Sequence, residues 1–166
     1  MIIIEGIDGV GKTTLVEYLC KEKGFIKFHF DYYVNNMNLK EKYLKILDSD
    51  NLDKLVLDRS FISEMVYGPV IRDKCKLTIE EYIYLLNEYK KIGAQIIYLV
   101  APKQVLLDRR KIDERDYSMI DIYYEELNTY YENVMELSKE YITIDKFDTY
   151  INDENEIQDK VRKLIK

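Results

Sequence analysis

Five short apolar runs recur along the chain, and polar stretches separate them. The runs are four to seven residues long and contain mostly isoleucine, leucine, valine and aromatic residues. Runs of this length and composition are typical of strands that a sheet buries on both faces. The pattern predicts strands within residues 1–4, 25–30, 54–60, 94–100 and 141–144.

Apolar residues at helical spacing occupy most of the segments between these runs. Leu15 and Leu19, for example, fall on one face of a helix that follows the first run. Thr78 and Glu81 form a capping box, which marks the start of another helix. Helices are predicted after residue 12, over 36–48, from Thr78 to near Gly93, from Pro102, from Tyr117, and after Asn152 or Asp153.

This alternation of strands and helices indicates a parallel sheet whose strands are joined by crossover helices. The chain has 166 residues, of which 47% are hydrophobic, and this is enough to bury one core of ordinary size. No repeat, linker or low-complexity segment divides the sequence. We therefore expect a single α/β domain over residues 1–166.

The segment between the first strand and the first helix reads GIDGVGKTT, residues 6–14. It fits GxxxxGK[ST], in which backbone N–H groups surround phosphate oxygens, the lysine reaches the outer phosphates and the hydroxyl contacts Mg²⁺. We expect a nucleoside triphosphate here, in a three-layer P-loop NTPase fold with a five-stranded parallel sheet flanked by helices. The residues expected to bind it are Asp8, Gly9, Val10, Gly11, Lys12, Thr13 and Thr14.

Polar residues at the ends of the other strands are the next candidates, because ligands of parallel sheets bind outside the carboxyl ends of the strands. Asp31 follows the second strand, and Asp58, Arg59 and Ser63 follow the third. Asp58 is expected to orient Mg²⁺ together with Thr13. Arg109, Arg110 and Arg115 follow the fourth strand through a short helix.

The run that carries these arginines, about 108–117, has two interpretations. A mixed-charge segment is commonly a solvated helix end. Its place after the fourth strand favours a lid that closes over the triphosphate, because phosphoryl transfer needs cations on the developing negative charge.

Charge and targeting patterns restrict the ligands further. The net charge of −6 argues against a surface that binds polymeric nucleic acid, and favours a small-molecule substrate. The N-terminal residues already form the first strand, with neither a basic leader nor a long apolar span. We expect a cytoplasmic protein that does not bind a membrane.

Three separated segments resemble the thymidylate kinases and their viral deoxynucleoside monophosphate kinase relatives. EGIDGVGKTT resembles the P-loop of that family, and DRSFISEMVYGPVIR resembles its Asp-Arg segment, with a later Tyr, Gly and Arg. YLVAPKQVLLDRRKIDERD resembles the fourth strand, its proline and the arginine-bearing lid. The three segments occur in the order of the family and extend over most of the chain.

The resemblance implies a role for each matching residue. Asp8 would face the 3′-hydroxyl of the acceptor, and Arg59 would bridge to the acceptor phosphate. Tyr67 would pack on the deoxyribose and disfavour a 2′-hydroxyl, with Arg72 near the acceptor phosphate or base. The cations on the transferred group would be Arg109 or Arg110, together with Arg115. The family also implies a homodimer, with the helices beside the Asp-Arg segment in the interface.

Two departures from the family concern the acceptor. Glu64 stands where the family often has an amide that reads the pyrimidine edge, and a carboxylate accepts from N3–H but cannot donate to a carbonyl. The Arg-Glu-Pro-Gly segment after the second strand is replaced by FDYYVNN, so the acceptor-binding region is reduced to about 31–48. Within it, Tyr32 and Tyr33 are candidates to stack on a base.

Together these observations predict transfer of the γ-phosphoryl group of ATP, with Mg²⁺, to a pyrimidine deoxynucleoside monophosphate, dTMP first and dUMP second. A monophosphate brings its own ionised nucleophile and needs no general base. A deoxynucleoside kinase is the main alternative, since it needs a carboxylate base and its relatives carry one at the position of Asp31. A kinase of a modified base in DNA, and a P-loop binding or switch module, are further alternatives. The arginine-rich lid and the lack of an NKxD motif argue against the switch.

Overall fold

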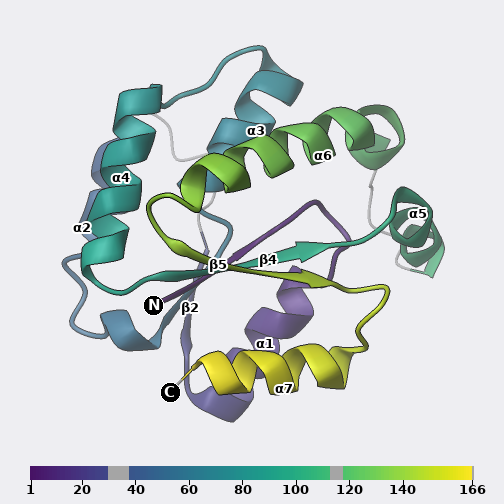
Figure 1. Cartoon of the computed structure of the whole chain (residues 1–166), viewed down its shortest axis with the longest axis horizontal. Helices are drawn as coiled ribbons and strands as arrows, with labels where there is room; N and C mark the ends of the chain where they lie inside the picture. The colour runs from purple at the N-terminus through teal and green to yellow at the C-terminus, as the bar shows by residue number, and fades with distance from the viewer. Residues whose placement is uncertain (30–37, 113–117, 166) are drawn as a thin grey trace.

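One parallel sheet forms the centre of the molecule, in the strand order β2-β3-β1-β4-β5 (Figure 1). The computed structural model describes residues 1–29, 38–112 and 118–165, without the side chains of residues 29, 110–112, 118 and 119. The sheet confirms the predicted α/β fold. Its strands are β1 (Ile2–Glu5), β2 (Ile26–His29), β3 (Leu55–Asp58), β4 (Gln95–Val100) and β5 (Thr143–Asp148).

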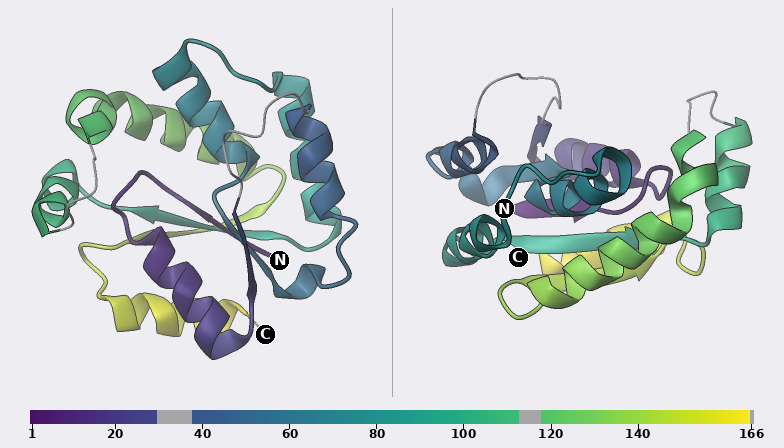
Figure 2. Two further views of the ribbon diagram at one scale, coloured as in Figure 1. Left: turned by 180° about the vertical axis from the view of Figure 1, so that it is seen from behind. Right: turned by 90° about the horizontal axis from the view of Figure 1, so that it is seen from above.

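Helices cover both faces of this sheet and create three layers (Figures 1 and 2). On one side lie α1 (Lys12–Lys23) and α7 (Glu154–Leu164). The helices α2 (Leu39–Ile46), α3 (Phe61–Arg72), α4 (Ile79–Lys91) and α6 (Ser118–Ser138) lie on the other. A 3₁₀ turn, η1 (Leu52–Lys54), precedes β3, and α5 (Lys103–Ile112) lies beyond the carboxyl end of β4.

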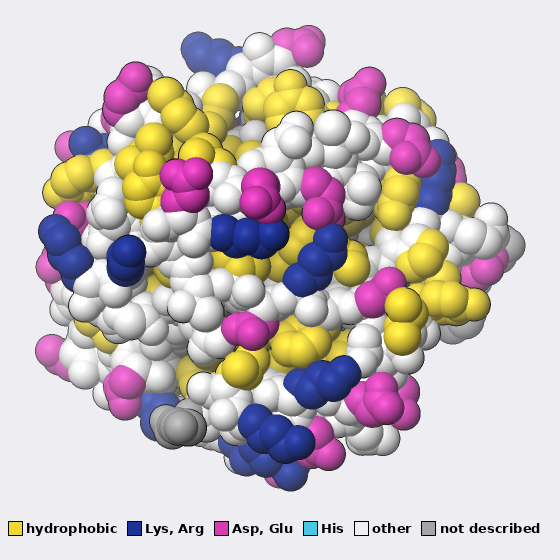
Figure 3. Space-filling model, viewed as in Figure 1, with side chains coloured by type: hydrophobic (Ala, Val, Ile, Leu, Met, Phe, Trp, Pro, Cys, Tyr) yellow, Lys and Arg dark blue, Asp and Glu magenta, His cyan; other side chains and the backbone are white. Residues whose placement is uncertain are grey.

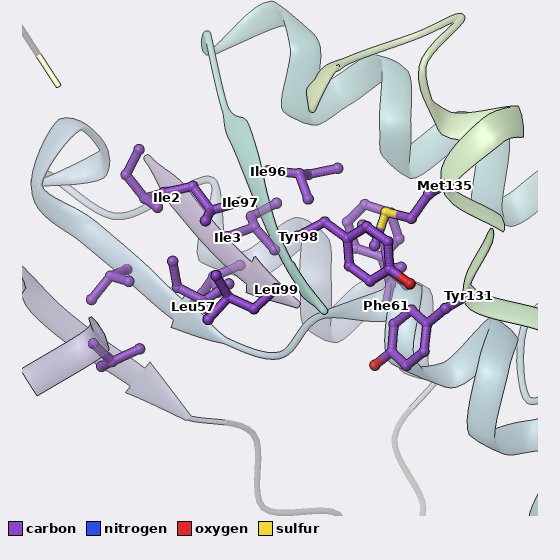
Figure 4. Close-up of a cluster of buried hydrophobic side chains, with 14 of the residues drawn as sticks. Ile2, Ile3, Leu57, Phe61, Ile96, Ile97, Tyr98, Leu99, Tyr131 and Met135 are labelled. Carbon is purple, nitrogen blue, oxygen red and sulfur yellow. The ribbon is translucent and has the colours of Figure 1, made fainter. Parts of the chain in front are cut away.

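The core lies around the three central strands. Every residue of β1 and β3 is buried, because helices cover both faces of these strands and leave no solvent side. Ile2 and Ile3 of β1 pair in register with Gln95 and Ile96 of β4. Figure 4 shows the packed isoleucines of these strands. The buried sheet fixes where each strand ends, and therefore where the loops that follow begin.

The helix α3 is the element that the sequence pattern does not identify. Gly68 and Pro69 interrupt its apolar periodicity, and proline in a helix interior removes one backbone donor. The helix begins because the Ser60 side chain accepts from Ile62 N–H and caps it. Phe61 then anchors its first turn, with edge-to-face contacts to three buried tyrosines, Tyr43, Tyr82 and Tyr89, at centroid distances of 5.1 to 5.6 Å.

The fifth strand lies later in the sequence than predicted. The apolar run at 141–144 covers only the first part of the strand, which extends from Thr143 to Asp148. β5 is an edge strand and is only partly buried, so polar residues such as Asp145 and Lys146 continue it. Thr149 is therefore the first residue beyond the strand, and its N–H bonds to Val100 O at 2.8 Å.

Substitution of Gly6 tests how closely the loop after β1 packs on β4. A Cβ atom at Gly6, where φ is 143°, would lie 2.3 Å from Leu99 O. Gly24 also has positive φ, 66°, but a Cβ there meets nothing within 4 Å. We expect Gly6→Ala to cost about 3 kcal/mol or more of unfolding free energy in urea, and the control Gly24→Ala about 1 kcal/mol. Equal losses in the two variants would contradict the close approach.

Candidate active site

The loop after β1 brings backbone groups and one ammonium group together at the carboxyl edge of the sheet. Gly9 and Gly11 adopt positive φ, 84° and 95°, and Lys12 begins α1 directly afterwards. The Lys12 Nζ donates to the carbonyls of Gly6 and Ile7, both at 2.9 Å. This is the geometry of a phosphate-binding loop in which the lysine folds back over its own turn.

Lys12 has little contact with solvent. Burial and the nearby Arg59 guanidinium lower the pKa of Lys12 to about 7, against the opposing effect of the Asp8, Glu5 and Asp58 carboxylates. Phosphate oxygens at this position would favour the ammonium form, because opposite charges at short range raise the pKa of a cation.

A pocket of about 450 Å³ opens over this loop. Three cationic side chains, Lys12, Arg59 and Arg109, line it together with the carboxylate of Asp58. The other lining residues are Asp8, Gly9, Val10, Gly11, Thr13, Thr14, Leu15, Leu99, Thr149, Glu154, Ile157 and Gln158. The structure thus brings together the whole predicted phosphate loop, the predicted metal ligands and two of the five predicted arginines.

Thr13 and Asp58 fit the role of magnesium ligands. Both line the pocket, and hydroxyl and carboxylate oxygens are the hard ligands that Mg²⁺ takes beside substrate phosphates. Asp58 is 7% exposed, and its Oδ2 pairs with Lys27 Nζ at 2.8 Å. Among the described residues, no group of three His, Cys, Asp or Glu side chains could hold a metal ion.

Asp8, Arg59 and Tyr67 form a cluster beside the loop. The Arg59 guanidinium pairs with Asp8 and donates to Tyr67 OH at 3.2 Å, and Tyr67 OH donates to Asp8 Oδ2 at 3.2 Å. Burial opposes the charge of Asp8, but Arg59 and Lys12 outweigh it, and the pKa of Asp8 lies below its ordinary value. Three of the residues that the family resemblance assigns to the acceptor therefore lie together.

Arg109 connects α5 to the loop and to the end of β5. Its guanidinium donates to Gly9 O at 3.1 Å, to Thr149 Oγ1 at 3.0 Å and to Thr149 O at 2.8 Å. These bonds hold a cation at the wall of the pocket, where phosphoryl transfer needs one.

Glu64 and Arg72 do not line the pocket. Both Glu64 carboxylate oxygens accept from Arg72 Nη2 at 2.7 Å, and Oε1 also accepts from Lys76 N–H at 2.7 Å. Glu64 is 3% exposed, so this ion pair is part of the interior of the α3 region. Ser63 lies on the same helix, but its Oγ accepts a hydrogen bond from Arg59 Nη1 at 3.3 Å.

Several predicted site residues fall outside the described residues. Asp31, Tyr32 and Arg115 belong to this group, as do the remainder of segment 31–37 and the end of the predicted lid, 113–117. The side chain of Arg110 is likewise not described.

The sequence analysis did not identify four contributors to this region. Glu5 lies buried under the loop, and the hydroxyl of Tyr131 on α6 contacts its carboxylate. Lys27 pairs with Asp58 from β2. Thr149 was not recognised because the predicted fifth strand ended at residue 144. In the structure β5 ends at Asp148, so Thr149 lies at a strand end, where ligands of parallel sheets bind.

Figure 3 shows the charged side chains on one face of the molecule. Lysine, arginine and acidic side chains alternate across the face shown, and no continuous basic area extends over its described residues. None of the described helices has both the length and the apolar character needed to cross a bilayer.

No protein-family model and no curated protein matches the chain. Among solved structures, the chain is similar to the YorR protein of Bacillus subtilis in complex with phosphorylated GDP, with 25% identity, a TM-score of 0.80 and coverage of 99% of this chain and 94% of that one. It is also similar to deoxyadenosine kinase from M. mycoides with bound dCTP, with 22% identity, a TM-score of 0.65 and coverage of 99% and 98%. For thymidylate kinase from Candida albicans the identity is 14%, the TM-score 0.63 and the coverage 99% and 89%.

These similarities show that the chain has the fold of P-loop nucleotide and nucleoside kinases. The family resemblance seen in the sequence is confirmed at the level of that fold.

Because the pKa of Lys12 is lowered, calorimetry can test the role of Lys12 through the protons taken up when nucleotide binds. Below pH 7 Lys12 is mostly protonated before nucleotide binds, and above pH 7 it is not. Because bound phosphate favours the ammonium form, we expect MgATP binding to take up close to one proton at about pH 8.5 and little at this site at about pH 6. Titrations in buffers of different ionisation enthalpy measure the uptake. Uptake that is no larger at the higher pH would contradict the role of Lys12.

Proposed function

We propose that the chain is a Mg²⁺-dependent kinase that transfers the γ-phosphoryl group of ATP to a pyrimidine deoxynucleoside monophosphate, dTMP first and dUMP second. The observation that carries this proposal is the position of Arg59. Its guanidinium lines the phosphate pocket and also pairs with Asp8 and Tyr67 beside it. One fixed cation can therefore serve a donor phosphate and an acceptor phosphate together.

Each described residue has a distinct task in this reaction. The loop N–H groups and Lys12 hold the outer phosphates, while Thr13 and Asp58 would hold Mg²⁺. That ion, when bound, neutralises charge on the phosphate oxygens. Arg59 and Arg109 balance the charge that develops on the transferred group, with Arg110 and Arg115 as the proposed partners in the lid. Asp8 and Tyr67 face the sugar of the acceptor.

The acceptor phosphate is itself the nucleophile in this scheme. It arrives ionised, so the protein has only to align it with the donor and to exclude water. The reduced acceptor region over 31–48, the lid over 108–117, the homodimer and the cytoplasmic location stay predictions from the sequence.

A deoxynucleoside kinase is the second candidate. The similarity to deoxyadenosine kinase extends over nearly the whole of both chains and has a TM-score like that of thymidylate kinase. A nucleoside offers a hydroxyl, and Asp31 would then serve as the base that removes its proton.

An acceptor panel separates the two candidates. ADP release is measured with ATP and Mg²⁺ on nucleosides and on their 5′-monophosphates, and with GTP as a second donor. We expect turnover on pyrimidine deoxynucleoside monophosphates, and an Asp31→Asn variant with nearly unchanged turnover. Activity on nucleosides that disappears in Asp31→Asn would instead establish the second candidate.

Replacement of the loop lysine tests phosphoryl transfer itself. We expect Lys12→Ala to lower kcat on the order of 100-fold or more, because one pre-positioned cation in a buried site contributes on that scale. Lys21→Ala is the matched control, since Lys21 lies on the same helix with its side chain 75% exposed. Circular dichroism checks that both variants fold. Full turnover in Lys12→Ala would reject the assignment.

Asp8 provides a test of acceptor recognition. We expect Asp8→Ala to raise KM for the acceptor about tenfold and to leave KM for ATP within about twofold, because Asp8 is assigned to the sugar and not to the donor. A loss confined to ATP would place Asp8 on the donor side.

A further inference from the structure

A carboxylate lies buried directly beneath the phosphate loop. Glu5 ends β1, has no exposed surface and is not among the residues that line the pocket. Four donor groups surround it: Ser60 N–H at 2.7 Å, Ser60 Oγ at 2.8 Å, Ser63 Oγ at 2.7 Å and Tyr131 OH at 3.2 Å. These groups come from the start of α3 and from the middle of α6.

A buried carboxylate is costly unless donors and positive charge compensate it. Burial raises the pKa of Glu5 above its ordinary value, and the hydrogen bonds from Ser63 and Ser60 and the charges of Arg59 and Lys12 offset part of that rise. All four donors hydrogen-bond best to an ionised carboxylate, which only accepts. The N-terminus of α3 adds its own partial positive charge at the same place.

The donors around Glu5 are also neighbours of Arg59. Arg59 has a φ of 72°, which is unfavourable for a non-glycine residue and persists only where neighbouring bonds fix the backbone. Its N–H bonds to Ile4 O at 3.1 Å, and the next N–H along the chain, that of Ser60, bonds to Glu5. Both sides of the strained residue are thus tied to the end of β1.

The guanidinium of Arg59 is connected to Glu5 through hydroxyl groups. Arg59 Nη1 donates to Ser63 Oγ at 3.3 Å, and Ser63 Oγ donates to Glu5 Oε2 at 2.7 Å. Tyr131 OH accepts from the same nitrogen at 3.4 Å and contacts Glu5. Ser63 Oγ thus donates to Glu5 and accepts from Arg59, while the Tyr131 hydroxyl lies 3.2 Å from both Glu5 Oε2 and Gly6 O and can give its one proton to either.

We propose that Glu5 is a positioning residue that fixes the backbone and the guanidinium of Arg59 for phosphoryl transfer, through Ser60, Ser63 and Tyr131. The assignment of Arg59 to the reaction rests on the proposed function; the link from Glu5 to Arg59 rests on the contacts alone. Glu5 touches neither nucleotide and acts only through the residues above it.

Glu5→Gln is the central variant, because it keeps the shape and replaces one acceptor oxygen with an N–H₂ group. A hydroxyl that faces this N–H₂ group must accept from it and turn its own proton elsewhere, so the hydrogen-bond chain from Glu5 to Arg59 is altered. We expect kcat to fall at least about tenfold while KM for ATP stays within about threefold. In an Arg59→Lys background, where the guanidinium fork is absent, Glu5→Gln should lower kcat less than about twofold.

Tyr131→Phe tests the same link without changing the buried charge, and it covers the case in which Glu5→Gln fails to fold. We expect kcat to fall at least about threefold. Tyr82→Phe is its matched control, since Tyr82 is also a fully buried tyrosine whose hydroxyl bonds a serine, Ser138, outside the pocket. The control should lower stability and leave kcat unchanged.

The orientation of Arg59 can be observed without turnover. Nitrogen NMR of arginine side chains reports whether rotation of the guanidinium is slow, as expected for a group held by Asp8, Ser63 and Tyr67. We expect Glu5→Gln and Tyr131→Phe to speed this rotation, and Tyr82→Phe to leave it slow.

The two measurements separate the possible failures. An Arg59 signal unaffected by Glu5→Gln and Tyr131→Phe, or an undiminished effect of Glu5→Gln in the Arg59→Lys background, would overturn the positioning role. If Glu5→Gln and Tyr131→Phe speed the rotation of the Arg59 guanidinium but the wild-type protein turns over no acceptor, the link to Arg59 is upheld and the proposed function is rejected.

Discussion

The buried charge of Glu5 is the constraint around which the site is arranged. A carboxylate with no exposed surface needs donors, and they come from Ser60, Ser63 and Tyr131. Their bonds fasten the start of α3 and the middle of α6 to the end of β1, where the phosphate loop begins. Phe61 adds apolar anchorage next to this point through its contacts with Tyr43, Tyr82 and Tyr89. The hydrogen bonds to Glu5 and the aromatic contacts of Phe61 therefore both hold the turn between β3 and α3.

Around the pocket, above Glu5, cationic side chains pair with carboxylates or with backbone carbonyls. Arg59 pairs with Asp8, Lys27 pairs with Asp58, and Lys12 bonds to carbonyls of its own loop. The two ion pairs join segments that are distant in sequence, and the pair between Arg59 and Asp8 also ties the loop to the end of β3. The same groups carry the chemistry proposed for the site, because cations and hard oxygen ligands are what a transferred phosphoryl group and its Mg²⁺ require. Stability of the pocket and reactivity toward phosphate thus depend on one set of side chains.

The sequence was a good guide wherever the signal was local. Thr78 and Glu81 form the predicted capping box, and Asp153 is the cap of the last helix. The sequence pattern did not predict α3, because Gly68 and Pro69 interrupt its apolar periodicity although tertiary packing supports the helix. It also misplaced β5, because an edge strand needs no continuous apolar run. The second error also concealed Thr149, since its position at a strand end follows only from the true boundary. Tyr131 lies on α6, and the apolar spacing that predicts such a helix gives no indication of where a hydroxyl points.

The sequence by itself determined the five strands in their succession along the chain, the parallel sheet and the phosphate loop, because each depends on residue spacing within a few turns of chain. Only the tertiary structure decided which groups meet around Glu5 and Arg59. Glu5 and Tyr131 are 126 positions apart, and Asp8 and Arg59 are 51 apart. Contacts across such distances depend on the strand order β2-β3-β1-β4-β5, which places the ends of β1 and β3 side by side and brings α6 over them. No local pattern encodes this spatial order of the strands, since it results from the packing of the whole sheet.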